Sequence, residues 1–394
     1  MKSNNDDGGG RYCKCCHTLW DYKGVPEAKG YALLAMGRGV AVMGNVVLNA
    51  ALLELAQRAA GCPTGEELKA LNDEEYTCPN KVYGQNPLAL ISNIAVITGL
   101  LSALFMPIIG VILDFTSYRR FIGMGFSIVF TIIQIIQIGI GPKTWFPMAI
   151  LQSIGGFCFA GMIMTSLAYL PEICEVVGQT KHSRYTARFT AKQFILQALF
   201  LILVGGLSFA FGISDNSTYT ARLAQGMNAV CISILFGVGW MKYMPSRPAS
   251  RSLPEEGMRT CTTIIGYGLK QNFRTANSIF HQYKKGLLWF LIAEVFAQSS
   301  VGALTTLSVV YLSDVVGLNA TDVSLFFLIV LVGTIPGAGV APVVARRFNP
   351  NIAWQLSMLC LFITIVVGAF TLGNSSNKYL SLIWGFFVGF VLGW

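Results

Sequence analysis

Apolar segments of about 20 residues, the length that a helix needs to cross the hydrocarbon core of a bilayer, recur along nearly the whole sequence. We expect ten membrane-spanning helices, at approximately residues 31–56, 88–113, 121–140, 145–170, 192–213, 223–244, 286–312, 323–344, 353–373 and 379–394. Only 12% of the 394 residues are charged, whereas about 25% are charged in an ordinary soluble domain. The sequence therefore predicts an all-α polytopic membrane protein.

The positions of Lys and Arg predict how these helices are oriented. With a cytosolic N-terminus, the inside segments hold 21 of the 28 Lys and Arg residues and the outside loops hold six. The positive-inside rule favours this orientation, and the net charge of +9 then faces the cytosolic leaflet and requires no nucleic-acid partner. The Asn-x-Ser/Thr sequons all fall in loops placed outside, where they are candidate glycosylation sites. They begin at Asn216, Asn319 and Asn374.

The cysteines and histidines argue against a metal site or an enzyme. Cys62 and Cys78 lie in the first outside loop, where oxidising conditions favour a disulfide, with two free thiols as the alternative. The Cys and His cluster at residues 13–17 is too crowded to supply four metal ligands. Two interpretations of these cysteines remain, which are palmitoylation of a cytosolic tail and a disordered tail with incidental cysteines. The sequence has no phosphate-binding Gly-x-x-x-x-Gly-Lys-Ser/Thr loop, and its three histidines lie outside the spans. We therefore expect no cofactor, no catalysis and no ATP-driven pumping.

One short cytosolic connection interrupts the apolar pattern with charged residues. The stretch GVILDFTSYRR places Gly110, Asp114, Arg119 and Arg120 between the second and third spans. Glycine lets two helices approach closely, the carboxylate can pair with a cation, and the arginines can extend into the headgroup layer. We predict a conformational latch here; the alternative is a topology anchor with an incidental aspartate.

Ionisable residues inside predicted spans identify a candidate solute site, because burying charge in a membrane is costly. Helical spacing puts Arg38, Asn45 and Asn49 on one face of the first span. The same spacing puts Glu294 and Gln298 on one face of the seventh span. An arginine and a glutamate on facing helices could bind a zwitterion or form a proton-coupled pair. Alternatively, each residue lies near the membrane interface and extends to the headgroups or pairs with a lysine. The candidates are Arg38, Asn45, Asn49, Glu294 and Gln298.

Several stretches resemble a known transporter family. GVILDFTSYRR resembles the Gly-x-x-x-Asp signature between helices two and three of the major facilitator superfamily. Six spans, a basic loop and a second series of spans are similar to its two-repeat plan. AYLPEI, GLKQNFRTANSIFHQYKKGLLWFLIAEVFAQSS and VVYLSDVVGLNATDVSLFFLIVLVGTIPGAGVAPVVARRF resemble the branch named for autophagy-related vacuolar effluxers. This resemblance implies alternating-access export of amino acids from an acidic compartment, in a vacuolar, lysosomal or plasma membrane.

The expected organisation has four parts. They are a cytosolic disordered tail at 1–30, a six-helix bundle at 31–244, a cytosolic linker with an amphipathic helix at 245–285, and a second bundle at 286–394. A two-repeat plan implies twelve helices, so we expect the sequence to continue in a longer protein; the alternative is a ten-helix form closed by a partner. The expected partners are a small solute, protons as the candidate coupling ion, and the lipid bilayer. The rival function is a non-transporting membrane sensor or scaffold.

Overall fold

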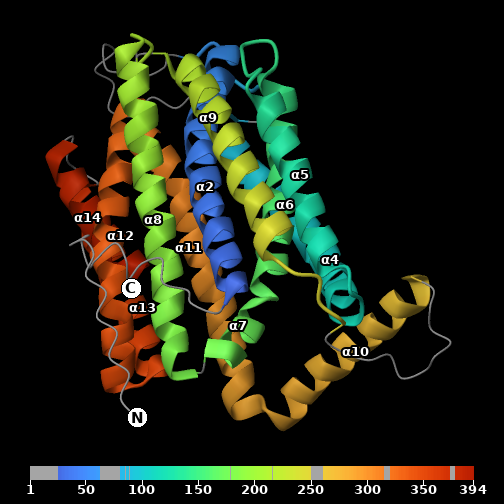
Figure 1. Ribbon diagram of the computed structural model, residues 1–394. Coiled ribbons are helices and arrows are strands. Elements are labelled where there is room, and N and C mark those ends of the chain that lie inside the picture. Colours follow the sequence, from blue (N-terminus) through green and yellow to red (C-terminus); the bar gives the residue numbers. More distant parts are fainter. Residues whose placement is uncertain are drawn as a thin grey trace, which may run out of the picture.

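The computed structural model describes residues 25–62, 80–84, 86–87, 89–177, 179–214, 216–249, 261–314, 320–372 and 378–394. These residues form helices joined by short connections (Figure 1). The helices are α2 (Pro26–Ala59), α4 (Ala89–Phe115), α5 (Arg119–Gln137), α6 (Trp145–Leu167), α7 (Leu170–Val177), α8 (Gln179–Ala210), α9 (Ser217–Val238), η1 (Gly239–Tyr243), α10 (Cys261–Gln282), η2 (Lys284–Leu288), α11 (Trp289–Asp314), α12 (Ala320–Phe348), α13 (Pro350–Leu372) and α14 (Lys378–Gly393).

The spans predicted from hydropathy coincide with these helices. In the part of the chain that the structure describes, nine helices are long and apolar enough to cross a membrane, and Tyr379–Gly393 is a shorter apolar helix. The prediction of a polytopic helical membrane protein is therefore confirmed. The largest boundary error is at α8, which begins at Gln179 and not at residue 192. Its first turns are polar and basic, so hydropathy does not detect them.

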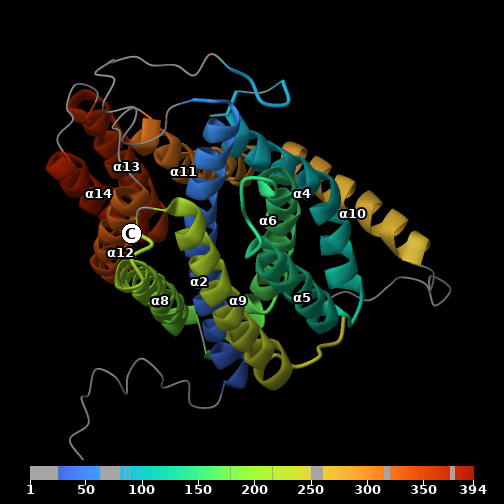
Figure 2. The same cartoon turned by 90° about the horizontal axis from the view of Figure 1, so that it is seen from above.

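Helix α2 lies at the centre of the first six spans, with α8 and α9 on either side of it (Figures 1 and 2). It is the most buried span. Two glycines seven residues apart let α9 approach closely, because Gly37 lies directly against the ring of Phe236 and Gly44 against the amide of Asn228. Since lipid does not surround α2, polar side chains on it can face other helices and the spaces between them.

One packing arrangement of the first series of spans recurs in the second. Helix α6 packs on α4 and α5, and the corresponding helix α14 packs on α12 and α13. The backbones of α12 and α14 are in direct contact. Cβ atoms added at Gly333 and Gly337 would overlap the backbone of α14, and Cβ atoms added at Gly389 and Gly393 would overlap the backbone of α12. Small residues at four-residue spacing are typical of closely packed membrane helices. Helix α8 joins the two series through its contact with α12.

Helix α10 extends away from the spans at the end of the bundle where α2 and α5 begin, which we call the basic end (Figure 1). It contacts the last turns of α4 through Gly268, which lies against Val111, and through the rings of Tyr267 and Phe115, whose centroids are 5.7 Å apart. Beyond this contact its side chains are largely exposed; Phe273, for example, is 76% exposed. The linker is therefore attached to the first six spans through α4.

Candidate functional site

Arg38 is buried in the middle of α2 and is only partly satisfied there. It is 9% exposed, and its Nη1 donates to Ser166 Oγ on α6 at the long distance of 3.5 Å. Its guanidinium carbon lies 5.2 Å from the centroid of the Tyr31 ring. Nε is buried without a hydrogen-bond partner. Arg38 lies about 18 Å along the helix from Pro26. Because Nε is unpaired, the buried guanidinium keeps N–H donors for an anionic group.

Asn45 and Asn49 continue the same face of α2 toward the opposite end of the bundle. Both residues are partly buried, and each has a side-chain oxygen that is buried without a hydrogen-bond partner. An unpaired buried carbonyl is unfavourable, and an N–H donor from a ligand or from water would satisfy it. The face therefore presents positive donors at Arg38 and unpaired acceptors beyond it, which suits a small solute that carries both an anionic group and N–H groups.

The pairing of Glu294 with Arg38 across the bundle stays a prediction. Gln298 Nε2 donates to Glu294 Oε1 at 2.8 Å, so these two residues share one face of α11, as helical spacing requires. Glu294 is partly buried and Gln298 is exposed. Helix α11 contacts α4 and α12, and within the described residues the polar partner of Arg38 is Ser166. These local contacts leave the predicted clamp untested.

Arg119 belongs to a chain of alternating charges at the basic end. It is 3% exposed, its Nε donates to Leu113 O at 2.9 Å, and its Nη1 donates to Glu172 Oε1 of α7 at 3.0 Å. The other Glu172 oxygen lies 3.2 Å from Arg247 Nε, an ion pair without hydrogen-bond geometry. Arg247 Nη2 in turn donates to Glu27 Oε1 at 2.6 Å. This charge chain connects α5, α7, the segment after η1 and the first turn of α2.

The remaining residues of the predicted latch occupy three different environments. Arg120 Nη2 donates to the carbonyl of Met241 at 2.9 Å, which joins α5 to η1. Gly110 faces α6, since an added Cβ would lie 2.8 Å from the flexible end of Met164. Asp114 is half-buried in the last turn of α4. Sequence reasoning found the two arginines but missed the glutamate that pairs with Arg119, although its position within AYLPEI, directly after a proline, marks a helix start.

A buried chain of amides crosses the first bundle near the end opposite the basic end. Gln137 Nε2 donates to Gln152 Oε1 at 2.9 Å, and Asn228 Nδ2 donates to Gln134 Oε1 at 2.7 Å. Gln225 Nε2 donates to the Gly44 carbonyl of α2 at 3.0 Å. These amides bond α6, α5, α9 and α2 together. These interhelical hydrogen bonds satisfy the amides within the protein and join the spans of the first bundle.

The predicted modification sites lie only partly in the described residues. Cys62 is buried just beyond α2 and is disulfide-bonded; Cys78 lies outside the described residues, so their pairing stays a prediction. Asn216 is exposed at the start of α9, where its Oδ1 accepts from the backbone N–H groups of Thr218 and Tyr219 at 3.1 and 3.2 Å. Asn319 and Asn374 also lie outside the described residues. Within those residues no cluster of three or more His, Cys, Asp or Glu could hold a metal ion.

Comparison with known proteins identifies the family. Residues 24–388 match the profile of the family described as vacuole effluxer Atg22 like, which is of the major facilitator type. The match includes every span from α2 to α13 and most of α14. A search of curated proteins gives no match. The chain is thus a multi-pass integral membrane protein, and it belongs to the Atg22-like vacuole effluxer family.

Proposed function

We propose that this protein is a secondary transporter that exports a small zwitterionic solute, of the amino-acid class, from a vacuole-like compartment. Membership of an effluxer family supports transport of a small molecule. The buried polar face of α2 supports a solute with an anionic group and N–H groups. Alternating access would expose this face to each side of the membrane in turn.

Arg38 is the observation on which this proposal rests. A guanidinium that only packed the bundle would be expected to satisfy its donors within the protein, because an unpaired buried charge is costly. Arg38 instead has one long hydrogen bond, one ring contact and a free buried Nε. A carboxylate can satisfy two guanidinium N–H groups at once. Asn45 and Asn49 supply acceptors for the ammonium group on the same helix face.

An efflux assay with the full chain tests the proposal. Proteoliposomes are loaded with a mixture of amino acids, and the appearance of each outside is followed by mass spectrometry. The wild-type chain is expected to export a subset of the mixture. Arg38→Gln should lower that efflux about 10- to 100-fold, because a hydrogen bond to a charged group contributes about 1.5–3 kcal/mol.

Arg58→Gln is the matched control, because Arg58 lies on the same helix but is 58% exposed and pairs with Glu54. Its efflux should remain near that of the wild type. Equal efflux from the Arg38 and Arg58 variants would contradict the assignment of the α2 face. Saturable binding of an amino acid without any efflux would instead favour the sensor function.

A further inference from the structure

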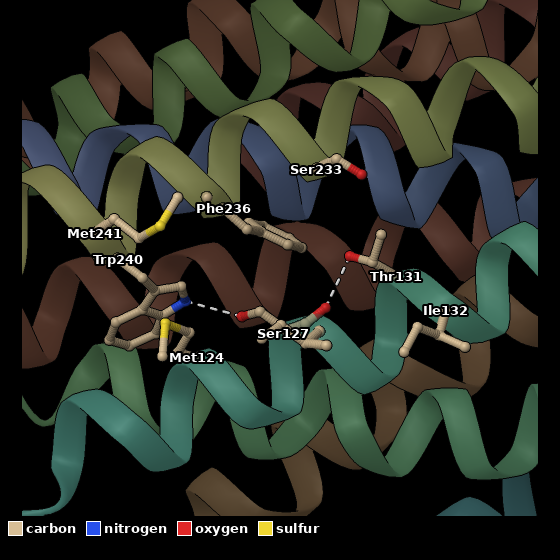
Figure 3. Close-up of a pocket in the computed structure, with 10 residues that line it drawn as sticks. Met124, Ser127, Thr131, Ile132, Ser233, Phe236, Trp240 and Met241 are labelled. Carbon is tan, nitrogen blue, oxygen red and sulfur yellow. Dashed lines mark hydrogen bonds between the residues drawn. The ribbon is translucent and has the colours of Figure 1, made fainter.

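An apolar slot of about 220 Å³ lies between α5 and α9, on the side of α9 away from α2 (Figure 3). Its walls include Met124, Ile128 and Ile132 of α5 and Gly237 of α9, and Trp240 closes its inner side. The indole Nε1 of Trp240 donates to Ser127 Oγ at 2.8 Å, which holds this edge of the ring against α5 (Figure 3).

The polar atoms that line the slot are already satisfied by the protein. Ser127 Oγ donates to the Gly123 carbonyl at 2.8 Å and accepts from Trp240, while Thr131 Oγ1 donates to the Ser127 carbonyl at 2.8 Å. Ser233 Oγ donates to the Ala229 carbonyl at 2.6 Å. A polar solute would find these hydroxyl donors already used and would lose its hydration. The slot therefore suits an apolar chain, in contrast to the face of α2 that carries Arg38.

The slot opens to the outside of the bundle and not to its interior. Ile128, Ile132 and Met241 on its rim are 51%, 49% and 64% exposed. The ring of Phe236 closes the opposite wall and lies directly against Gly37 of α2. In a membrane-spanning bundle, an exposed apolar rim on two spans faces the hydrocarbon core. Acyl chains are the apolar groups available on that side.

Two cations lie where the slot reaches the basic end. Arg120 is held there by the hydrogen bond from its Nη2 to the Met241 carbonyl, which leaves the other guanidinium N–H groups for a ligand. Lys242, the residue that follows Met241 in η1, is exposed. An arginine and a lysine at the headgroup level attract anionic lipid, and a fixed guanidinium can bind a phosphate through two N–H groups.

We propose that this slot binds one anionic glycerophospholipid, with an acyl chain between α5 and α9 and the phosphate at Arg120 and Lys242. The site is separate from the proposed solute site, since Phe236 lies between the slot and α2. Because the ring of Phe236 also contacts the residue that precedes Arg38, an occupied slot would stabilise the position of α9 beside the solute-binding face.

Photo-crosslinking of the full chain in phosphatidylcholine vesicles tests the proposal. A trace of phosphatidylserine with a diazirine on its acyl chain is activated by light, and the labelled residues are mapped by peptide mass spectrometry. The reference surface is the exposed apolar face of α4 around Val96, Leu100 and Leu104. Labelling of the slot residues at 124–132 and 233–241 should exceed that of α4 at least about fivefold.

Gly237→Leu should fill the slot and reduce its labelling to the level of α4. Gly226→Leu is the control on the same helix, because an added Cβ there has open space and does not line the slot. Slot labelling equal to that of α4, or unchanged by Gly237→Leu, would overturn the proposal.

The same probe with a phosphatidylcholine headgroup tests the role of the cations. Phosphatidylserine should label the slot more strongly than phosphatidylcholine, and Lys242→Gln should remove most of that difference. Lys143→Gln, an exposed lysine at the opposite end of the bundle, should leave it unchanged. Equal labelling by the two lipids would show that the slot does not select an anionic headgroup, and would overturn that part of the proposal.

Discussion

Glu172→Gln is the sharpest test of the charge chain at the basic end, because glutamine keeps the shape of the side chain but removes its negative charge and one of its two acceptor oxygens. Arg119 is 3% exposed, so water cannot replace the lost carboxylate. The hydrogen bond to a charged partner contributes about 1.5–3 kcal/mol. In the ion pair with Arg247, the Arg247 side chain is 36% exposed and the Glu172 side chain 28%, so this pair adds at most about 1 kcal/mol to stability. We expect the free energy of unfolding to fall by about 2–4 kcal/mol.

Unfolding of the purified full chain in detergent, followed by its tryptophan fluorescence during denaturant titration, measures this change. Glu175→Gln is the matched control, because Glu175 is an exposed acid on the same short helix α7. The double variant with Arg119→Gln should be more stable than the sum of the two single losses predicts, since no buried charge is then left uncompensated. Equal stability of the Glu172 and Glu175 variants would refute the role given to the charge chain.

Three further predictions concern other parts of the chain. Gly337→Leu should impair folding by separating α12 from α14, whereas Gly339→Leu, with open space around it, should not. Size-exclusion chromatography of the two purified variants measures this difference in folding. Thr218→Ala removes the sequon at Asn216 but keeps its helix cap, so it should abolish any glycosidase-sensitive shift in gel mobility without lowering thermal stability. Glu294→Gln should reduce proton-coupled efflux from acid-loaded proteoliposomes while leaving membrane insertion unchanged.

The spans could be predicted from the sequence because each must bury its backbone hydrogen bonds in a helix and present apolar side chains to lipid. Hydropathy therefore located α4, α6 and α11 to within a few residues. It could not locate the start of α8, where polar and basic turns precede the apolar segment. It also gave no sign of α7, which is only eight residues long.

The polar contacts could be predicted only in part. Helical periodicity placed Arg38, Asn45 and Asn49 on one face, where the structure shows Arg38 buried and the two asparagines partly buried. The partner of Arg119 could not be found in the same way, because Glu172 is 53 residues away in sequence and meets it only through helix packing. The pairing of Glu294 with Arg38 rests on pseudo-symmetry alone, which does not specify which helix faces meet, and it stays a prediction.

Water accessibility of the α2 face tests most directly whether it forms the solute pathway. Asn49→Cys in the full chain is treated with a membrane-impermeant methanethiosulfonate reagent, and modification is read at that residue by peptide mass spectrometry. Ala41→Cys is the control, because Ala41 is fully buried on the same helix. If the face lines a pathway, Asn49→Cys should react readily and Ala41→Cys should not. Equal lack of reaction at both positions would contradict the proposed site.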